Sequence, residues 1–176
     1  EGLSLIRSNL DGKGELEVNV MVDVGFSNTK MLIADANEVY ASYVSPVAGL
    51  AFTKIISDSF KLPPVQAEEY KRTYGLDGTQ LEGKLLASAQ PILNTLIADV
   101  KKVISSYTNS YPERKIERIL LNGGGSYLKG LLSILVHQTG LEVIMGDCFA
   151  KKKIKQEFSS MGAVFGVAMG LGMEVR

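Results

Sequence analysis

Two turns hold the residues best suited to binding chemistry. The first follows an alternating apolar segment, 18–24, and has the pattern Asp23-x-Gly25-x-x-x-Thr29. Its backbone amides, with the hydroxyls of Ser27 and Thr29, can surround phosphate oxygens. The alternative is an ordinary hairpin in which Asp23 caps its own turn. Because 18–24 alternates apolar and polar residues, we expect a half-buried strand before the turn.

The second turn contains three consecutive glycines, Gly123, Gly124 and Gly125, after an apolar strand pattern. A turn without side chains lets backbone approach a flat ligand or a neighbouring backbone closely. Close packing between a strand and a helix would also require glycine, so the turn alone does not decide for a ligand. Ser126 suits the N-cap of a following helix.

A third candidate is a polar pair on a helix predicted to begin near residues 63–64. Glu68 and Lys71 are three residues apart and therefore share one helix face. A carboxylate can accept hydrogen bonds from two ribose hydroxyls, and a lysine stem can cover an adenine face. The alternative is a solvated surface on which Glu68 pairs with Arg72, four residues on.

The residue patterns predict both strands and helices around these candidate residues. The first three strands are close enough to form an antiparallel meander, whereas the last two alternate with helices and should pair in parallel. The fold class is therefore α/β, with a mixed five-stranded sheet flanked by helices. Strands are predicted at about 17–24, 29–34, 38–44, 117–122 and 141–145, and helices at about 48–60, 63–74, 81–107 and from 126.

Composition indicates one globular domain. The 176 residues are 45% hydrophobic and 22% charged, which excludes a disordered chain. Nineteen basic and nineteen acidic residues cancel, so we expect no nucleic-acid partner. No apolar run reaches membrane-spanning length. A single cysteine, Cys148, favours a reducing cytoplasm, and an isolated His137 on a leucine-rich segment argues against a metal site.

Two further segments admit simple interpretations. The basic run 151–155 could attract anionic lipid, but we interpret it as a solvated connector. Gly162, Gly166 and Gly170 recur at every fourth residue in an apolar segment too short to span a bilayer. We expect a C-terminal helix packed closely against the sheet.

The order of these motifs resembles the second half of the actin-like (ribonuclease H-like) ATPase fold, and within it the PilM family of type IV pilus assembly. The likeness extends from about residue 18 to the end of the sequence. Its motifs are Val22-Asp23-Val24-Gly25, Ala67-Glu68-Glu69-Tyr70-Lys71, Leu121-Asn122-Gly123-Gly124-Gly125 and the closing segment 162–171.

The resemblance implies an ATP site. Glu68 and Lys71 match the ribose and adenine contacts, and Gly123, Gly124 and Gly125 match the adenosine turn. The second phosphate loop is matched by Asp23, Gly25, Ser27, Asn28 and Thr29.

Three departures from the family pattern argue against hydrolysis. Lys30 stands where actin-like ATPases often have an acidic residue, and Asn122 stands where a small Ser or Thr is common. Segment 45–49 replaces a glycine pair before a helix. The resemblance also implies an isolated second half, which offers only one wall of the cleft, so we expect no enzymatic activity from this chain. Mg-ATP would be a structural or regulatory ligand of a longer parent, for which hydrolysis stays an open alternative.

The resemblance also implies a domain organisation and partners. Residues 1–176 would be one actin-like second domain, with a core at 17–45 and 115–176, an inserted helical subdomain at about 46–114, and the first domain absent. The family role is a cytoplasmic scaffold that docks on a PilN-like bitopic inner-membrane protein and couples it to the assembly motor ATPase. The alternatives are half of an actin-like ATPase or sugar kinase, or an FtsA-like division protein.

Overall fold

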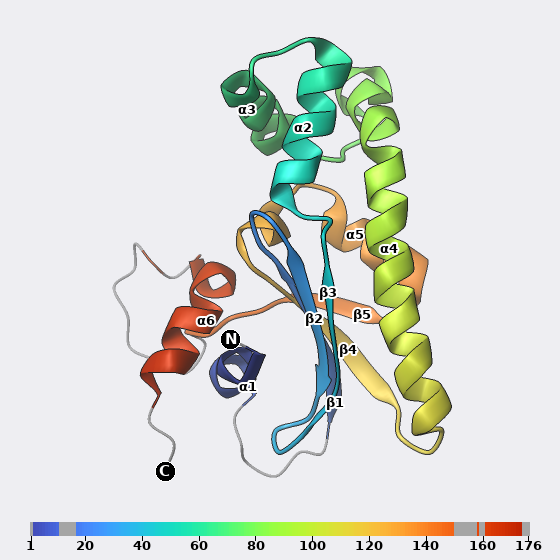
Figure 1. Cartoon of the computed structure of the whole chain (residues 1–176), viewed down its shortest axis with the longest axis vertical. Helices are drawn as coiled ribbons and strands as arrows, with labels where there is room; N and C mark the ends of the chain where they lie inside the picture. Colours follow the sequence, from blue (N-terminus) through green and yellow to red (C-terminus); the bar gives the residue numbers. More distant parts are fainter. Residues whose placement is uncertain (1, 11–16, 150–157, 159–160, 174–176) are drawn as a thin grey trace.

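The computed structural model describes residues 2–10, 17–149, 158 and 161–173, which excludes the basic run 151–155. At its centre lies a five-stranded sheet with the order β3-β2-β1-β4-β5 (Figure 1). β2 pairs antiparallel with both β1 and β3, whereas β4 pairs parallel with β1 and β5 pairs parallel with β4. The predicted mixed sheet is therefore confirmed. Its strands are β1 (Val18–Val24), β2 (Thr29–Ala34), β3 (Val39–Ser45), β4 (Ile116–Asn122) and β5 (Glu142–Met145).

Helices cover both faces of this sheet. α4 and α5 lie against one face, and α1 and α6 lie beyond the other, whereas α2 and α3 stand past the end of the sheet where β1 turns into β2 (Figure 1). The α-helices are α1 (Gly2–Asn9), α2 (Gly49–Phe60), α3 (Pro64–Tyr74), α4 (Lys84–Ser110), α5 (Leu131–Thr139) and α6 (Gly162–Gly172). Two short 3₁₀ helices, η1 (Gln80–Gly83) and η2 (Gly124–Tyr127), complete the described elements.

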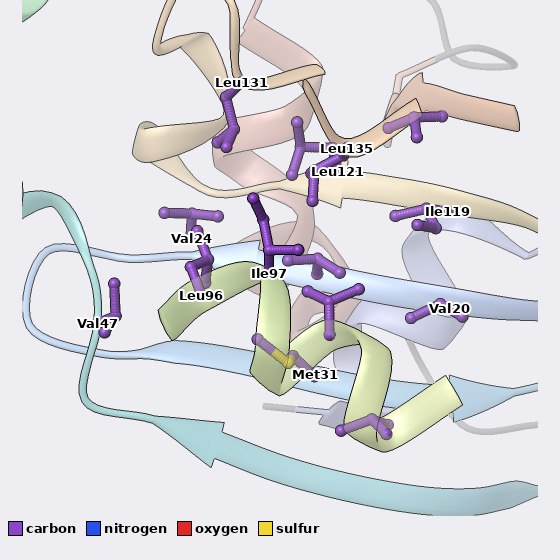
Figure 2. Close-up of a cluster of buried hydrophobic side chains, with 14 of the residues drawn as sticks. Val20, Val24, Met31, Val47, Leu96, Ile97, Ile119, Leu121, Leu131 and Leu135 are labelled. Atoms are coloured by element: carbon purple, nitrogen blue, oxygen red, sulfur yellow. The ribbon is translucent and has the colours of Figure 1, made fainter. Parts of the chain in front are cut away.

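The larger core lies between the sheet and the pair α4 and α5. Leu96 and Ile97 of α4 point at the sheet, and Leu131 and Leu135 of α5 extend the cluster over β4 (Figure 2). Val100 of α4 is also fully buried. The apolar stripe predicted for the longest helix is therefore core.

β1 is buried on both faces, so the predicted half-buried strand is wrong. Val20 and Val22 face the α4 side, and Met21 points to the opposite face, where it packs in a second cluster with Leu5 of α1. The sequence patterns do not predict α1, so the predicted strand has one open face. Asn19, which lies on this second face, is buried and donates a side-chain hydrogen bond of 2.9 Å to the carbonyl of Glu17.

Two predicted helix starts are also wrong. The helix expected from Ser126 begins at Leu131, because residues after the triple glycine first form η2 and Gly130 has a φ of +85°. The hydroxyl of Ser126 donates to the carbonyl of Gly123 at 2.6 Å within that 3₁₀ turn. The helix expected from residue 81 begins at Lys84, after a kink at which Leu81 is left-handed with a φ of +48°.

α6 packs mainly on α1, which corrects the expectation that it packs on the sheet. A side chain at Gly170 would collide with the backbone of Ser4, and a Cβ at Gly166 would lie 3.1 Å from Leu5. The glycines recurring at every fourth residue thus let two helices approach closely. A hydrogen bond of 2.9 Å from the Gly123 amide to the Ala163 carbonyl joins the start of α6 to the glycine turn.

The helices past the sheet end have a small core of their own. Ile56 of α2, Ala67 of α3 and Leu85 of α4 are buried together. Within the described ranges, no helix is both long enough and apolar enough to cross a membrane.

Candidate functional site

A cavity of about 400 Å³ opens where the end of β1, the start of α2, the middle of α3 and η2 meet. It lies at the junction between the sheet and the helices beyond it. Its walls come from segments widely separated in the sequence. The lining residues are Val24, Gly25, Phe26, Gly49, Phe52, Glu68, Lys71, Arg72, Gly124, Gly125, Tyr127 and Leu128.

The turn after β1 is tied to the N-terminus of α2. The amide of Gly25 donates to the carbonyl of Asn28 at 3.0 Å, which closes the hairpin. The first amides of α2 then bond to carbonyls of this turn, from Gly49 to Gly25 at 3.1 Å and from Leu50 to Phe26 at 2.8 Å. These two donors, which a helix cannot satisfy internally, therefore hold the turn in place. A Cβ at Gly49 would lie 3.3 Å from the Gly25 oxygen, so glycine permits the close approach.

The other residues predicted for this turn do not line the cavity. Thr29 is fully buried and its hydroxyl donates to the carbonyl of Val47 at 2.6 Å, which fixes the segment before α2. Asp23 is half-buried at the end of β1, and burial raises the pKa of its carboxyl. Ser27 is exposed and Asn28 is half-buried. Their assignment to phosphate binding stays a prediction.

The three consecutive glycines meet different requirements. Gly123 has a φ of +82°, and a side chain there would collide with Asp23 and with the backbone of Val24. A side chain at Gly125 would collide with Val24. Gly124, in contrast, has no atom within 4 Å of the position that a Cβ would take, and it faces the cavity. Two glycines therefore serve packing between β1 and β4, and the middle one leaves the cavity wall bare.

Glu68 and Lys71 on the cavity wall form a compact polar cluster with Thr53, which is buried beside the cavity. The Lys71 ammonium lies 2.6 Å from Glu68 Oε2 and donates to Thr53 Oγ1 at 2.9 Å and to the Gly49 carbonyl at 3.0 Å. Thr53 Oγ1 lies 2.5 Å from Glu68 Oε2. Arg72 Nε donates to the other oxygen, Oε1, at 3.0 Å. Glu68 therefore pairs with Arg72, as the interpretation of a solvated surface held. It also lines the cavity together with Lys71, as the interpretation of a ligand contact required.

The carboxyl of Glu68 is strongly held as an anion. Burial by itself would raise its pKa, but the hydrogen bonds from Lys71, Thr53 and Arg72 outweigh burial and lower the pKa to about 2. The Glu68 carboxylate is thus ionised near neutral pH and can accept hydrogen bonds from hydroxyl groups.

Aromatic side chains, which no sequence motif indicates, form a further part of the cavity wall. Phe26 and Tyr127 are largely exposed beside the two turns, and Phe52 is buried beneath them. Tyr127 was detectable, because it lies two residues after the last glycine of the turn. Phe52 carried no signal apart from its place on an apolar helix face. Across the described residues, no group of three or more His, Cys, Asp or Glu side chains is placed to hold a metal ion.

Comparison with solved structures places this architecture in the actin-like fold. The chain superposes on a PilM–PilN type IV pilus biogenesis complex with a TM-score of 0.78 at 23% identity. It is also similar to the ethanolamine utilization protein EutJ from Carboxydothermus hydrogenoformans, with a TM-score of 0.66 at 18% identity, and to MreB5 of Spiroplasma citri bound to AMPPNP, with 0.66 at 13%.

These matches cover 97%, 96% and 97% of this chain but 50%, 51% and 56% of the respective solved chains. The chain therefore spans about half the length of the structures that it resembles. A family model described as type IV pilus assembly protein PilM matches residues 1–176, so the chain belongs to the PilM family. The resemblance found in the sequence is thereby confirmed. Among proteins with curated descriptions, no match was found.

Proposed function

We propose that this chain is the nucleotide-binding second half of an actin-like scaffold in type IV pilus assembly, and that adenine nucleotide occupies the cavity. The observation that supports this most strongly is the convergence of three sequence motifs on one cavity wall. Gly25, Glu68, Lys71, Gly124 and Gly125 come from the turn after β1, from α3 and from η2, and all five line it.

The chemistry of the walls suggests an orientation for the ligand. Glu68 supplies an anion for the sugar hydroxyls, and the bare backbone at Gly124 supplies a flat wall for the base. Because the Lys71 ammonium has three partners within the protein, its methylene stem is the part left to cover the base. The phosphates then point toward the turn of residues 25–29, beside the first amides of α2.

We propose that the nucleotide acts as a structural or regulatory ligand rather than as a substrate. Two of the departures from the ATPase pattern support this view. Lys30 follows Thr29 in β2, at the position where actin-like ATPases often have an acidic residue. Asn122 is fully buried, and its amide nitrogen donates to the carbonyl of Leu120 at 3.1 Å, so this end of the side chain is held within the sheet.

The family role further suggests partners and a location. One of the similar structures is a complex of PilM with PilN. By analogy, we propose that the parent of this chain docks on a PilN-like bitopic protein at the cytoplasmic side of the inner membrane, and that it couples this protein to the assembly motor.

Binding of the partner is directly testable. A fluorescent peptide containing the cytoplasmic segment of the PilN-like protein is titrated with a parent protein that contains both halves, with and without Mg-ATP. We expect saturable binding, at least severalfold tighter when nucleotide is present. A peptide of the same composition in scrambled order is the control. Equal binding of both peptides would rule out the scaffold function proposed here.

A further inference from the structure

We infer that Thr53 is a positioning residue for nucleotide recognition: its hydroxyl locks one oxygen of Glu68 and the ammonium of Lys71, so that the other Glu68 oxygen is reserved for the sugar hydroxyls of a ribonucleotide. This inference rests on the proposed function. It concerns a residue of α2 that is buried beside the cavity and that no sequence motif marked.

The geometry determines where the single hydroxyl proton of Thr53 goes. Thr53 Oγ1 lies 2.5 Å from Glu68 Oε2 and 3.0 Å from the Gly49 carbonyl, and both atoms are acceptors. The shorter contact is to a charged oxygen, which forms the stronger bond. The Gly49 carbonyl has a second donor, since Lys71 Nζ lies 3.0 Å from it. Thr53 therefore donates to Glu68 and accepts from Lys71.

The two carboxylate oxygens of Glu68 consequently differ. Oε2 accepts hydrogen bonds from the Thr53 hydroxyl and from the Lys71 ammonium, so both of its lone pairs are used. Both donor side chains are largely shielded from solvent. Oε1 receives Arg72, whose side chain is 78% exposed. An exposed ion pair of this kind contributes at most about 1 kcal/mol, so a ligand can displace it. Oε1 is therefore the oxygen available to hydroxyl groups that enter the cavity.

Loss of the Thr53 hydroxyl would remove this distinction. Without it, Lys71 loses an acceptor and Glu68 Oε2 loses its shortest hydrogen bond, so the orientation of the carboxylate depends on Lys71 and on the exposed Arg72 alone. The affinity should fall for ligands that carry the sugar hydroxyls and should be nearly unchanged for ligands that lack them. A purely structural residue would weaken both kinds of ligand equally.

The test compares Thr53→Val with Thr53→Ser in a parent protein that contains both halves. Valine matches threonine in shape and branching but has no hydroxyl, whereas serine keeps the hydroxyl. Calorimetry gives the affinities for Mg-ATP and for Mg-2′,3′-dideoxy-ATP. We expect Thr53→Val to weaken ATP about tenfold, equivalent to about 1.4 kcal/mol, and to change dideoxy-ATP less than twofold. Thr53→Ser should restore the preference for ATP.

The outcomes separate this inference from the function beneath it. If wild type binds neither nucleotide, both are overturned. If wild type binds ATP but Thr53→Val weakens both nucleotides equally, or neither, only the role of Thr53 is overturned. Thermal melts monitor folding, and Thr53→Ala, which suits a helix interior better than valine, replaces Thr53→Val if that variant does not fold.

Discussion

At the scale of single residues, the three consecutive glycines have different structural roles. Gly123 requires a positive φ and Gly125 lies against Val24, so both join β4 to β1. Gly124 contacts nothing at its Cβ position and faces the cavity. The sequence predicted a bare turn but offered no way to tell these roles apart, because they depend on how β1 lies beside β4.

The first prediction follows from the space at Gly124. In a parent with both halves, Gly124→Val should leave the protein folded and weaken adenine nucleotide binding at least tenfold, because the new side chain fills the cavity wall. Calorimetric titration measures the affinity, and thermal melting measures the fold. Gly125→Ala is the matched control: its Cβ would lie 2.9 Å from Val24 Cβ, so it should lower stability by about 1–3 kcal/mol. A folded Gly124→Val protein with undiminished affinity would refute the assignment of this wall.

A second prediction concerns Asp35, a buried carboxylate at the turn between β2 and β3. It accepts hydrogen bonds from the Tyr40 hydroxyl at 2.6 Å, from the Asn37 and Glu38 amides at 2.8 Å each, and from Arg114 Nη2 at 2.9 Å. Burial alone would raise its pKa, but these bonds outweigh burial and lower it to about 2.

As the pH falls from about 4 to 2, the Asp35 carboxylate is protonated in the unfolded chain before it is protonated in the folded protein. The stabilisation by Asp35 is therefore lost over that range. Over this pH range the free energy of unfolding of the wild type should fall by roughly 2 kcal/mol because of Asp35. Urea unfolding at several pH values tests it against Asp35→Asn, in which this part of the pH dependence should disappear. Because Glu68 titrates in the same range, the difference between the two proteins is the quantity to measure. Identical slopes would contradict the role given to Asp35.

At the scale of elements, α1 and α6 form a close helix pair that covers the second face of the sheet. Their approach depends on Gly166 and Gly170, since a side chain at Gly170 would collide with the Ser4 backbone. The fourfold glycine spacing predicted close packing correctly. It could not identify α1 as the partner, because a short amphipathic segment at residues 2–9 carries too few periods to be recognised as a helix.

A third prediction tests this packing. Gly170→Ala should lower the free energy of unfolding by about 2 kcal/mol or more, because the helices must separate to admit the methyl group. Gly172→Ala is the control in the same helix, since nothing lies within 4 Å of its Cβ position. Stability of that variant should be unchanged or slightly increased. Urea unfolding of both gives the comparison, and equal effects would show that the contact with α1 is unimportant.

Long elements with a clear period were predicted better than short ones. The strands around the first turn and the helix with the apolar stripe appear close to the expected residues. The errors in helix starts lie at α5 and at α4, where Gly130, Leu81 and Glu82 adopt positive φ values. A leucine or a glutamate in a sequence does not predict a left-handed conformation, because only the tertiary packing makes that conformation favourable.

At the scale of the whole molecule, the site exists only because distant segments meet. Gly25, the pair Glu68 and Lys71, and the pair Gly124 and Gly125 meet at one cavity because β1 pairs with β4 and because α2 and α3 stand over the end of the sheet (Figure 1). The motif order predicted this meeting through the family resemblance. Pairwise contacts such as Thr53 with Glu68 depend on side-chain geometry, and no spacing in the sequence encodes them.

The central claim is that this cavity binds adenine nucleotide without turning it over. Calorimetric titration of Mg-ATP into a parent protein with both halves, with phosphate release followed in the same sample, tests it most directly. Our account predicts saturable binding of one nucleotide per chain with no phosphate release above the level without protein. Steady release would contradict the scaffold role and favour an actin-like ATPase, whereas absence of binding would show that the cavity is only an architectural remnant.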